Sequence, residues 1–448
     1  MPRPSAEGRG LFSPTTAGGR YSSPRFPLFT LMVLGIRKLG LTVLTTATLC
    51  STVSRMAADP SVEVFTEGGT VTGAGEGGSS FLPQIPLRWS VTTGVGYNSN
   101  VSTTSVGAGS AFTSANLNVS KDLRTAKTQI SIALAAGVIH YIDRLDGPPN
   151  DYTGSVIISL AHNVSERLAL AASVNASYLA EPEFATDLGP ARRANYFSTS
   201  DSLTASYRLS PRLSADSSFQ LGMVKYADEL LSLVQDRVDF TFGESLRYGW
   251  SPRTTLTARY TFGLIDYDTF PRDSSTQTVL GGLDYQISPQ LKATVRGGAS
   301  FRKFKVGNSQ TTINPDGTAS LAYALGPSTS VSWTVGYSIE EPDFTETLSR
   351  TTVRTRTGLQ VSYQATRRLT TNLGLNYSHD VNAGLLASPG ADPQEFTQDG
   401  LGLVLGAKYA MNNRMGLTLG FTHAELKSAS PTGGYSSNSY TAGLAYSF

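Results

Sequence analysis

Residues 238–267 have the sequence VDFTFGESLRYGWSPRTTLTARYTFGLIDY, two alternating runs around a tight turn at 250–253. In the second run, apolar or aromatic side chains take every second position and polar side chains or glycine take the positions between. Successive side chains of a strand point to opposite faces, so the pattern predicts a hairpin with one apolar and one polar face. The apolar set is Leu256, Ala258, Tyr260, Phe262 and Leu264, and the alternate set is Thr255, Thr257, Arg259, Thr261 and Gly263.

Hairpins of this kind recur from Arg88 to Phe448, with candidate tight turns 37 to 46 residues apart. A propeller blade would place four short strands in such a period, but each period here holds two strands of roughly 11 to 15 residues. Long strands with short turns on one side and longer loops on the other indicate a transmembrane β-barrel. The turns centre on Asp122, Glu166, Pro211, Pro252, Pro289, Pro327, Arg367 and Asn413.

The fold class predicted is therefore all-β: a transmembrane antiparallel up-and-down barrel of about 18 strands. Sixteen is the alternative, because 112–120 alternates poorly. An even number places both ends of the barrel at the periplasm and the longer connections outside. These connections are expected at 98–100, 145–150, 181–193, 268–275, 307–312, 340–349, 381–398 and 428–438.

Aromatic residues concentrate near both ends of the expected strands. Amphipathic rings favour the boundary between membrane and water, so two belts one membrane apart are expected. Asp201 and Glu244 fall on the apolar parity, which implies a bulge, a boundary position or a register shift. The belts comprise Tyr207, Tyr248, Trp250, Tyr285, Tyr363 and Tyr409 near the short turns, and Tyr97, Tyr178, Tyr267, Tyr337, Tyr377 and Phe421 near the long loops.

The N-terminal 58 residues are interpreted as a targeting segment. Arg37 and Lys38 form a basic start, 39–49 is a short apolar stretch, and Met56-Ala57-Ala58 is a candidate cleavage site. Met32 is the expected start of translation, with residues 1–31 a misassigned beginning; an unusually long basic region is the alternative. Residues 59–87 are rich in glycine and are expected to form a flexible periplasmic segment or a plug in the lumen.

Charge and cysteine content exclude several classes. Removing residues 1–58 takes away seven of the 36 Lys and Arg and one of the 34 Asp and Glu, leaving a net charge of −4. Nothing in this charge favours a nucleic-acid partner. Cys50 is the only cysteine and leaves with the targeting segment, and the residues before it make a poor lipid-anchor motif. No apolar run reaches about 18 residues, so a helical membrane protein is not expected.

Two stretches carry a resemblance to known families. The last strand resembles the C-terminal signal of bacterial outer-membrane barrels, which implies recognition by the barrel-assembly machinery; the residues are Tyr440, Leu444, Tyr446 and Phe448. The opening strand at 94–101, GVGYNSNV, followed by hairpins of about 40 residues, is similar to the putative β-barrel porin families, some of which are associated with exopolysaccharide secretion. The resemblance covers 88–448 and implies a bacterial outer-membrane location, with outer-membrane lipid as surroundings and polysaccharide-export components as candidate partners.

The polar parity contains an excess of basic residues, which are the candidate pore lining. Rings of Arg or Lys favour anions in a channel; the alternative is ordinary lumen polarity with arginines paired to aspartates on neighbouring strands. Asp216, Asp239 and Asp284 share the inward parity. The candidate pore-lining residues are Arg208, Arg247, Arg259, Lys292, Arg296, Arg302, Arg354, Arg356 and Lys408.

Catalytic and metal motifs are weak. The four histidines are scattered without zinc-ligand spacing, and no nucleotide-binding or nucleophile-elbow pattern occurs. His379 and Asp380, with Asp266 and Asp268, are the best candidates for an active site at the outer rim. The prediction is therefore a non-enzymatic outer-membrane channel without metal or cofactor, passing small hydrophilic, anionic or saccharide solutes. A structural or assembly barrel of an exopolysaccharide-export system is the first alternative, and a rim-located hydrolase the second.

Overall fold

The computed structural model describes residues 87–144, 148–179, 194–305, 311–340, 351–383, 396–428 and 434–448. The predicted targeting segment, 1–58, lies outside these residues, as does the glycine-rich segment at 59–87 except for Leu87. In the described part, no helix is long and apolar enough to cross a membrane.

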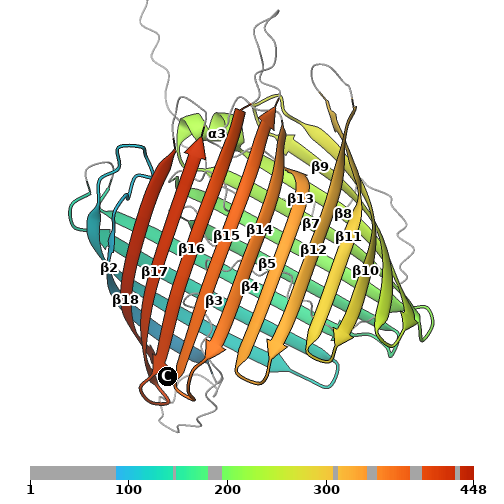
Figure 1. Cartoon of the computed structure of the whole chain (residues 1–448). Helices are drawn as coiled ribbons and strands as arrows, with labels where there is room; N and C mark the ends of the chain where they lie inside the picture. Colours follow the sequence, from blue (N-terminus) through green and yellow to red (C-terminus); the bar gives the residue numbers. More distant parts are fainter. Residues whose placement is uncertain are drawn as a thin grey trace, which may run out of the picture. The chain divides into compact units, whose positions relative to one another are not determined.

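Eighteen antiparallel strands form one closed sheet (Figure 1). Each strand pairs with its neighbours in sequence, and β1 pairs with β18 to close the ring. The strand number predicted from the turn spacing is confirmed, and the alternative of sixteen is wrong. The strands are β1 (Arg88–Asn98), β2 (Ser110–Arg124), β3 (Thr128–Tyr141), β4 (Asn150–Asn163), β5 (Leu168–Leu179), β6 (Tyr196–Arg208), β7 (Leu213–Tyr226), β8 (Arg237–Ser251), β9 (Thr254–Tyr267), β10 (Ser274–Ser288), β11 (Leu291–Phe304), β12 (Thr311–Leu325), β13 (Thr329–Glu340), β14 (Thr351–Gln364), β15 (Leu369–Ala383), β16 (Phe396–Ala410), β17 (Met415–Ser428) and β18 (Tyr435–Ser447).

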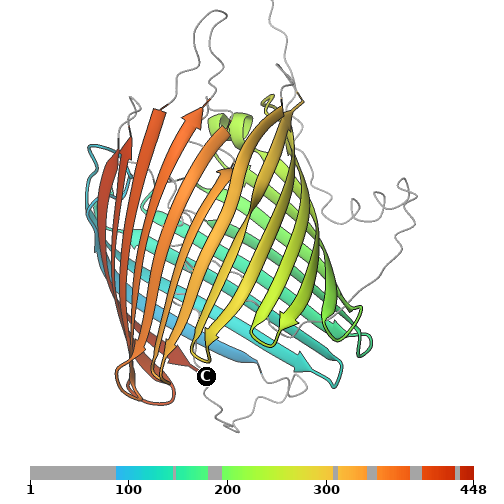
Figure 2. The same cartoon turned by 45° about the vertical axis from the view of Figure 1, so that its right-hand side comes forward.

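The short turns lie at the end of the barrel where β1 begins and β18 ends, opposite α3 (Figure 2). Four of the eight share one local device, in which a Ser, Thr or Asn side chain accepts backbone N–H groups two and three residues further on. In the β6–β7 turn, Ser210 Oγ accepts from Arg212 and Leu213 at 3.3 and 3.1 Å. Such side chains imitate a backbone turn and so favour tight connections. Ser288, Thr366 and Asn412 do the same in three other turns.

Three connections differ from the sequence expectation. The first, expected at 98–100, runs from 99 to 109. Asp122 is not in a turn: it pairs with Ser131 inside the β2–β3 ladder, and the turn follows at 125–127. The connection between β7 and β8 was not anticipated and contains the short helix α3 (Glu229–Gln235), whose N-cap Asp228 accepts from two backbone N–H groups.

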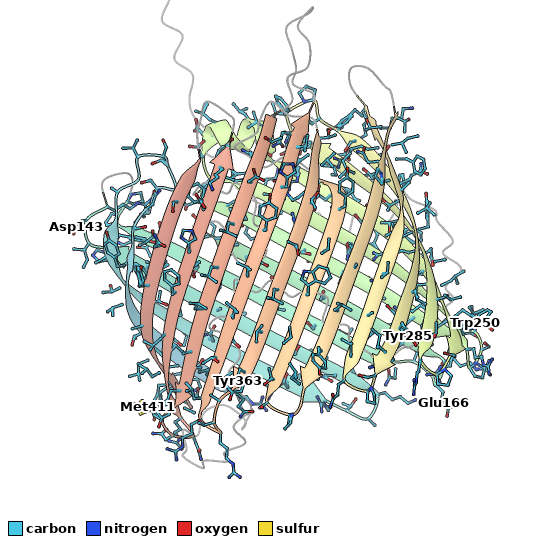
Figure 3. All side chains as sticks on the ribbon, in the orientation of Figure 1. Asp143, Glu166, Trp250, Tyr285, Tyr363 and Met411 are labelled. Atoms are coloured by element: carbon cyan, nitrogen blue, oxygen red, sulfur yellow. The ribbon has the colours of Figure 1, made fainter. Side chains whose placement is uncertain are left out.

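The barrel wall has an apolar outer face. Large apolar side chains that stay exposed occupy one parity on nearly every strand, as a lipid-facing surface requires. Trp250, Tyr285 and Tyr363 lie toward the short-turn end (Figure 3). One predicted member of the opposite belt is wrong: Tyr267 is buried and shares the inward parity of Arg259. Its side chain accepts a hydrogen bond from Arg272 in the β9–β10 connection, which explains the difference.

Asp201 and Glu244 remain on the outer parity without any bulge. Asp201 pairs with Val174 and Leu221, and the ladders on either side of β6 continue in unbroken register. Glu244 pairs with Ser217, whose hydroxyl donates to its carboxylate at 2.9 Å. Each carboxylate is near the middle of its strand, so neither the bulge nor the boundary explanation holds.

Candidate functional site

The candidate site is the inner face of the barrel. On β11 the exposed apolar residues Val295 and Phe301 have one parity, so Lys292, Arg296 and Arg302 have the other and face the lumen. The same comparison places Arg208, Arg247, Arg259, Arg354, Arg356 and Lys408 on the inner face of their strands.

One group of arginines lies toward the long-loop end and is already paired. Arg354 and Asp380 are both almost fully buried, with Nε to Oδ1 at 2.7 Å. The Glu340 carboxylate accepts from Arg354 at 3.0 Å and from Arg356 at 2.5 Å. Arg302, on β11, donates to the main-chain carbonyl of Glu340 at 3.1 Å. Much of the positive charge of these arginines is therefore balanced within the wall.

A second group of charges lies on β7 to β12 near the middle of the barrel. Arg247 contacts Asp216 at 2.5 Å, and Arg296 lies 3.7 Å from Asp284. Hydroxyl groups hold the carboxylates against the wall: Ser206 and Ser245 donate to Asp216, Thr294 to Asp284 and Ser300 to Asp316.

Arg259 is the central member of this group. It is opposite Ser245 on β8, which makes Arg247 its diagonal neighbour, and opposite Leu280 on β10, beyond which Arg296 lies on β11 opposite Gly282. It forms no hydrogen bond or ion pair with the residues that the structure describes, and it lies close enough to Arg247 and Arg296 to feel their charge. Asp316 contributes an opposite charge from β12. A half-buried cation among like charges is a place where a solute anion can bind.

The remaining candidates lie toward the short-turn end. Arg208, Lys292 and Lys408 are exposed and come from the terminal residues of β6, β11 and β16. They extend the basic surface toward the periplasmic end of the lumen.

The opposite wall differs in chemistry. Away from the strand ends, the inner parity of β1 to β6, β17 and β18 carries no charged residue. It presents hydroxyl, amide and small apolar side chains, including Thr92, Ser114, Asn116, Asn175 and Thr441. The lumen is therefore charged on one side and neutral on the other.

Several inward aromatic residues at the long-loop end are buried; the sequence reasoning placed Phe112 inward but missed Tyr141, Phe304 and Tyr435. Phe112 and Tyr141 pack together with Val101 of the first connection, and Phe304 and Tyr435 are buried at the same end. Their inward parity was readable from the alternation, but their burial under connecting segments was not. These aromatic rings support the mouth of the barrel and do not line a free path.

The residues suggested for a rim active site are not brought together. His379 and Asp380 are adjacent in sequence and so point to opposite faces of the wall. His379 Nδ1 lies 2.8 Å from Asp399 on the outer face, where the Tyr377 hydroxyl also donates to Asp399 at 2.7 Å. Asp380 is bound to Arg354 on the inner face.

The two other carboxylates of that suggestion are bound to lysines. Asp266 pairs with Lys305, and Asp268 pairs with Lys225. The hydrogen bond to Asp266 raises the pKa of Lys305, which lies just beyond the end of β11. These contacts are those of ion pairs at the rim.

No cluster of metal-binding side chains occurs among the described residues. His140, His162 and His423 each contact one neutral side chain on an adjacent strand, Asn150, Thr128 and Asn438 respectively.

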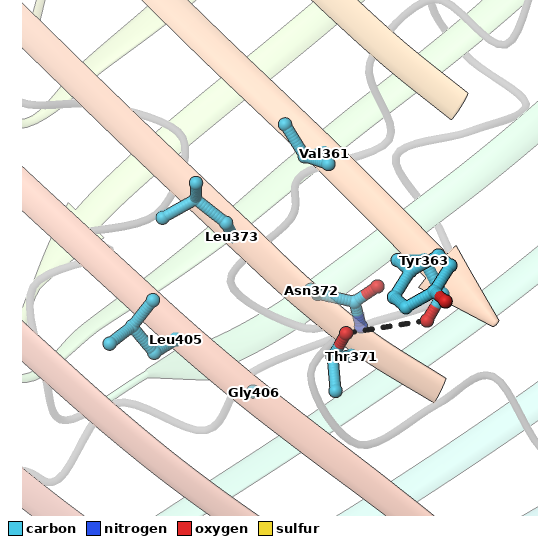
Figure 4. A pocket seen from close by; sticks show the side chains of 7 residues that line it. All are labelled: Val361, Tyr363, Thr371, Asn372, Leu373, Leu405 and Gly406. Carbon is cyan, nitrogen blue, oxygen red and sulfur yellow. Dashed lines mark hydrogen bonds between the residues drawn. The ribbon is translucent and has the colours of Figure 1, made fainter. Parts of the chain in front are cut away.

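A shallow apolar depression of about 310 Å³ lies on β14 to β16 (Figure 4). Val361, Leu373 and Leu405 line it from the outer parity, and Thr371 donates to the carbonyl of Tyr363 at 3.3 Å beside it. Apart from Tyr363, none of its lining residues is ionisable, and it belongs to the lipid-facing surface.

Comparison with known proteins gave one family and several structures. The family model described as putative beta-barrel porin 2 matches residues 86–448. No curated protein sequence matches the chain. OccAB4 of Acinetobacter baumannii is 12% identical at a TM-score of 0.43, covering 81% of this chain and 98% of that chain. OpdK of Pseudomonas aeruginosa, solved with vanillate, is 11% identical at a TM-score of 0.44, with the same coverage. The siderophore receptor PirA of P. aeruginosa is 11% identical at a TM-score of 0.40, covering 82% of this chain and 81% of that chain.

Proposed function

The chain belongs to the putative beta-barrel porin 2 family and is a porin-like barrel of the bacterial outer membrane, and we propose that its lumen prefers small anionic solutes. The observation that carries this proposal is Arg259, a lumen-facing cation between Arg247 and Arg296 with no hydrogen bond or ion pair to the described residues. At about 18 strands a barrel is too wide for side chains to fill, so a solute can reach this wall.

A charged side chain on the wall acts on ions in the water of the lumen. Charges act over a Debye length of about 8 Å at physiological salt, so a cation on the wall enriches anions in the water beside it. The three carboxylates nearby are held by hydroxyl donors against the wall, and two of them also contact Arg247 and Arg296. Arg259 is then the group best placed to meet a solute carboxylate.

The neutral wall extends the proposal to acidic saccharides. Serine, threonine and asparagine side chains on β1 to β6 offer hydrogen bonds to hydroxyl groups without selecting charge. A sugar acid could place its carboxylate toward β8 to β11 and its hydroxyls toward this wall. Liposome-swelling rates with glucuronate, glucose and glucosamine, compared at equal concentration, test this order of preference.

Ion selectivity is the direct test. Reversal potentials across planar bilayers under a KCl gradient are expected to show anion preference for the wild-type chain. Arg259→Gln should reduce the preference, and Arg259→Glu combined with Arg296→Glu should shift it toward cations. Arg253→Gln is the matched control, because Arg253 is an exposed arginine in the turn of the same hairpin.

The outcomes separate the alternatives. A wild-type channel that prefers cations, or an Arg259→Glu variant with unchanged reversal potential, would contradict the anion proposal. A folded barrel that gives no conductance steps would instead support the structural role in a polysaccharide-export system.

A further inference from the structure

The ladder between β12 and β13 stops halfway along the barrel wall. Its last pair toward the long-loop end is Gly317 with Tyr337. Beyond this pair, residues 314–316 of β12 are paired only with β11, and the described residues opposite them, 338–340 of β13, only with β14. The upper parts of the two strands diverge in both views (Figures 1 and 2). Between all other neighbouring strands, the described ladder continues at this end until one of the two strands has at most one strand residue left unpaired.

The unpaired stretch is at the depth of the outer leaflet. Gly317 is close to the midpoint of β12, so 311–316 form its extracellular half. Three residues at about 3.4 Å each span roughly 10 Å along the strand, or about 8 Å of membrane depth at a tilt near 40°. That is about a quarter of a hydrocarbon core of roughly 30 Å. We call this stretch, 314–316 facing 338–340, the lateral opening.

Pro315 explains why the ladder does not continue. Extending the register would place Pro315 opposite Ile339, but proline has no backbone N–H to donate and is confined to strand edges. The Asp316 side chain is turned toward β11 and accepts from Ser300 at 2.9 Å. Backbone groups without partners are costly in lipid, so an open seam in the wall requires a reason.

The lumen side of the lateral opening is basic. Arg302 reaches from β11 past β12 to the carbonyl of Glu340, the last residue of β13, at 3.1 Å. Arg354 and Arg356 hold the Glu340 carboxylate from β14. Three guanidinium groups share one carboxylate and one carbonyl at this corner, with Asp380 behind them.

The lipid side of the lateral opening has small side chains along β11 and β12, beside the exposed Ile313, and the larger Tyr337 and Ile339 along β13. Gly297, Ala299, Pro315 and Gly317 share the outer parity on β11 and β12, and a Cβ added at Gly297 would meet no atom within 4 Å. An alkyl chain can therefore lie flat against the wall beside the seam.

We propose that the lateral opening is a passage between the lumen and the outer leaflet for anionic amphiphiles, molecules with a carboxylate head and a long alkyl tail. The head group meets Arg356, the partly exposed guanidinium of this basic corner, and the tail remains against the small residues of β11 and β12. This route goes beyond the passage of small hydrophilic anions through the lumen, since it opens sideways and takes solutes that partition into lipid.

Photolabelling tests the passage. The chain, with its only cysteine changed by Cys50→Ser, is reconstituted in proteoliposomes with a diazirine-bearing stearic acid as the probe. Labels are expected on the inward residues Asp316, Ser338 and Arg356, which bilayer lipid cannot reach through a closed wall. Stearyl alcohol bearing the same diazirine, which lacks the carboxylate, should label these residues roughly tenfold less.

A cross-link across the seam supplies the second measurement. Asp316→Cys with Ser338→Cys, joined by oxidation or by a short bis-maleimide where the gap is wider, should lower the inward labelling by roughly tenfold while KCl conductance stays unchanged. Ser320→Cys with Thr334→Cys is the control, because these residues are paired in the closed half of the same seam. Inward labelling that is absent, that ignores the cross-link, or that is equal for the alcohol would overturn the proposal. A protein that shows no KCl conductance but retains inward labelling would contradict the proposed lumen channel and leave the lateral passage supported.

Discussion

Phe448 stacks on Trp89, with ring centroids 3.6 Å apart and ring planes within 6° of each other. The backbone N–H of Phe448 also donates to the Trp89 carbonyl at 3.0 Å. Phe448 is therefore bound to the start of β1, where β1 and β18 pair to close the ring.

Phe448→Ala is expected to weaken this closure. Aromatic pairs contribute about 0.5–1.5 kcal/mol beyond the area they bury, so the free energy of unfolding in lipid vesicles should fall by about that amount. Tyr285→Ala is the control, since Tyr285 is exposed at the same end and has no ring partner among the described residues. Equal losses of unfolding free energy in the two variants would mean that the Phe448–Trp89 stack contributes no stability beyond that of an unstacked ring at the same end.

Removing one partner of the buried ion pair should be costly. Asp380→Asn leaves Arg354 without its nearest carboxylate in a site where the two side chains are 4% and 2% exposed. A loss of about 3–5 kcal/mol is expected from urea unfolding in vesicles. Asp284→Asn, whose partner Arg296 is partly exposed at 3.7 Å, should cost less than about 1 kcal/mol. The reverse order would contradict the assigned burial.

Gly282 makes room for Arg296 on the inner face. A Cβ at Gly282 would lie 2.7 Å from Arg296 Cγ and 3.0 Å from the Val295 carbonyl. Gly282→Val should therefore displace the guanidinium and reduce anion preference in reversal-potential measurements, without removing any charge. Gly281→Val is the adjacent control, because a Cβ at Gly281 meets nothing within 4 Å and points to lipid. If both variants retain the wild-type preference, the position of Arg296 does not matter for selectivity.

The lipid-facing carboxylates should reduce stability. Asp201 and Glu244 are on the outer parity near the middle of their strands. Lys or Arg at such a depth costs about 2–4 kcal/mol and acidic residues less, so Asp201→Leu should raise the free energy of unfolding by about 1–2 kcal/mol. Leu246→Glu, on the same face as Glu244, should lower it. An Asp201→Leu variant that is less stable than the wild type would show that the Asp201 carboxylate makes a contact that stabilises the barrel.

The sequence was sufficient for the barrel because one property, alternation, specifies both strand and face. On β11 the alternation of Leu291, Val295 and Phe301 with polar residues predicts the observed register without a structure. The strand number followed from the spacing of turns, which are themselves local features.

Alternation within a strand does not predict which side chains contact each other across neighbouring strands. That Arg354 binds Asp380 while Arg259 has no such carboxylate depends on which residues become opposite after closure. The burial of Tyr267 depends on Arg272 in a connection that folds back over it. Pro315 stands in the printed sequence as a break in a strand, but only the pairing of both its neighbours shows that one seam is left open.

The one-sided charge of the lumen implies a transverse electric field. Arginines on β8, β9 and β11 face a wall without ionised groups, so the potential falls across the channel as well as along it. A solute with a dipole would be turned before it passes, with its negative end toward Arg259. Two stereoisomers of one sugar acid, equal in size and charge, would then present different hydroxyl groups to the neutral wall and cross at different rates.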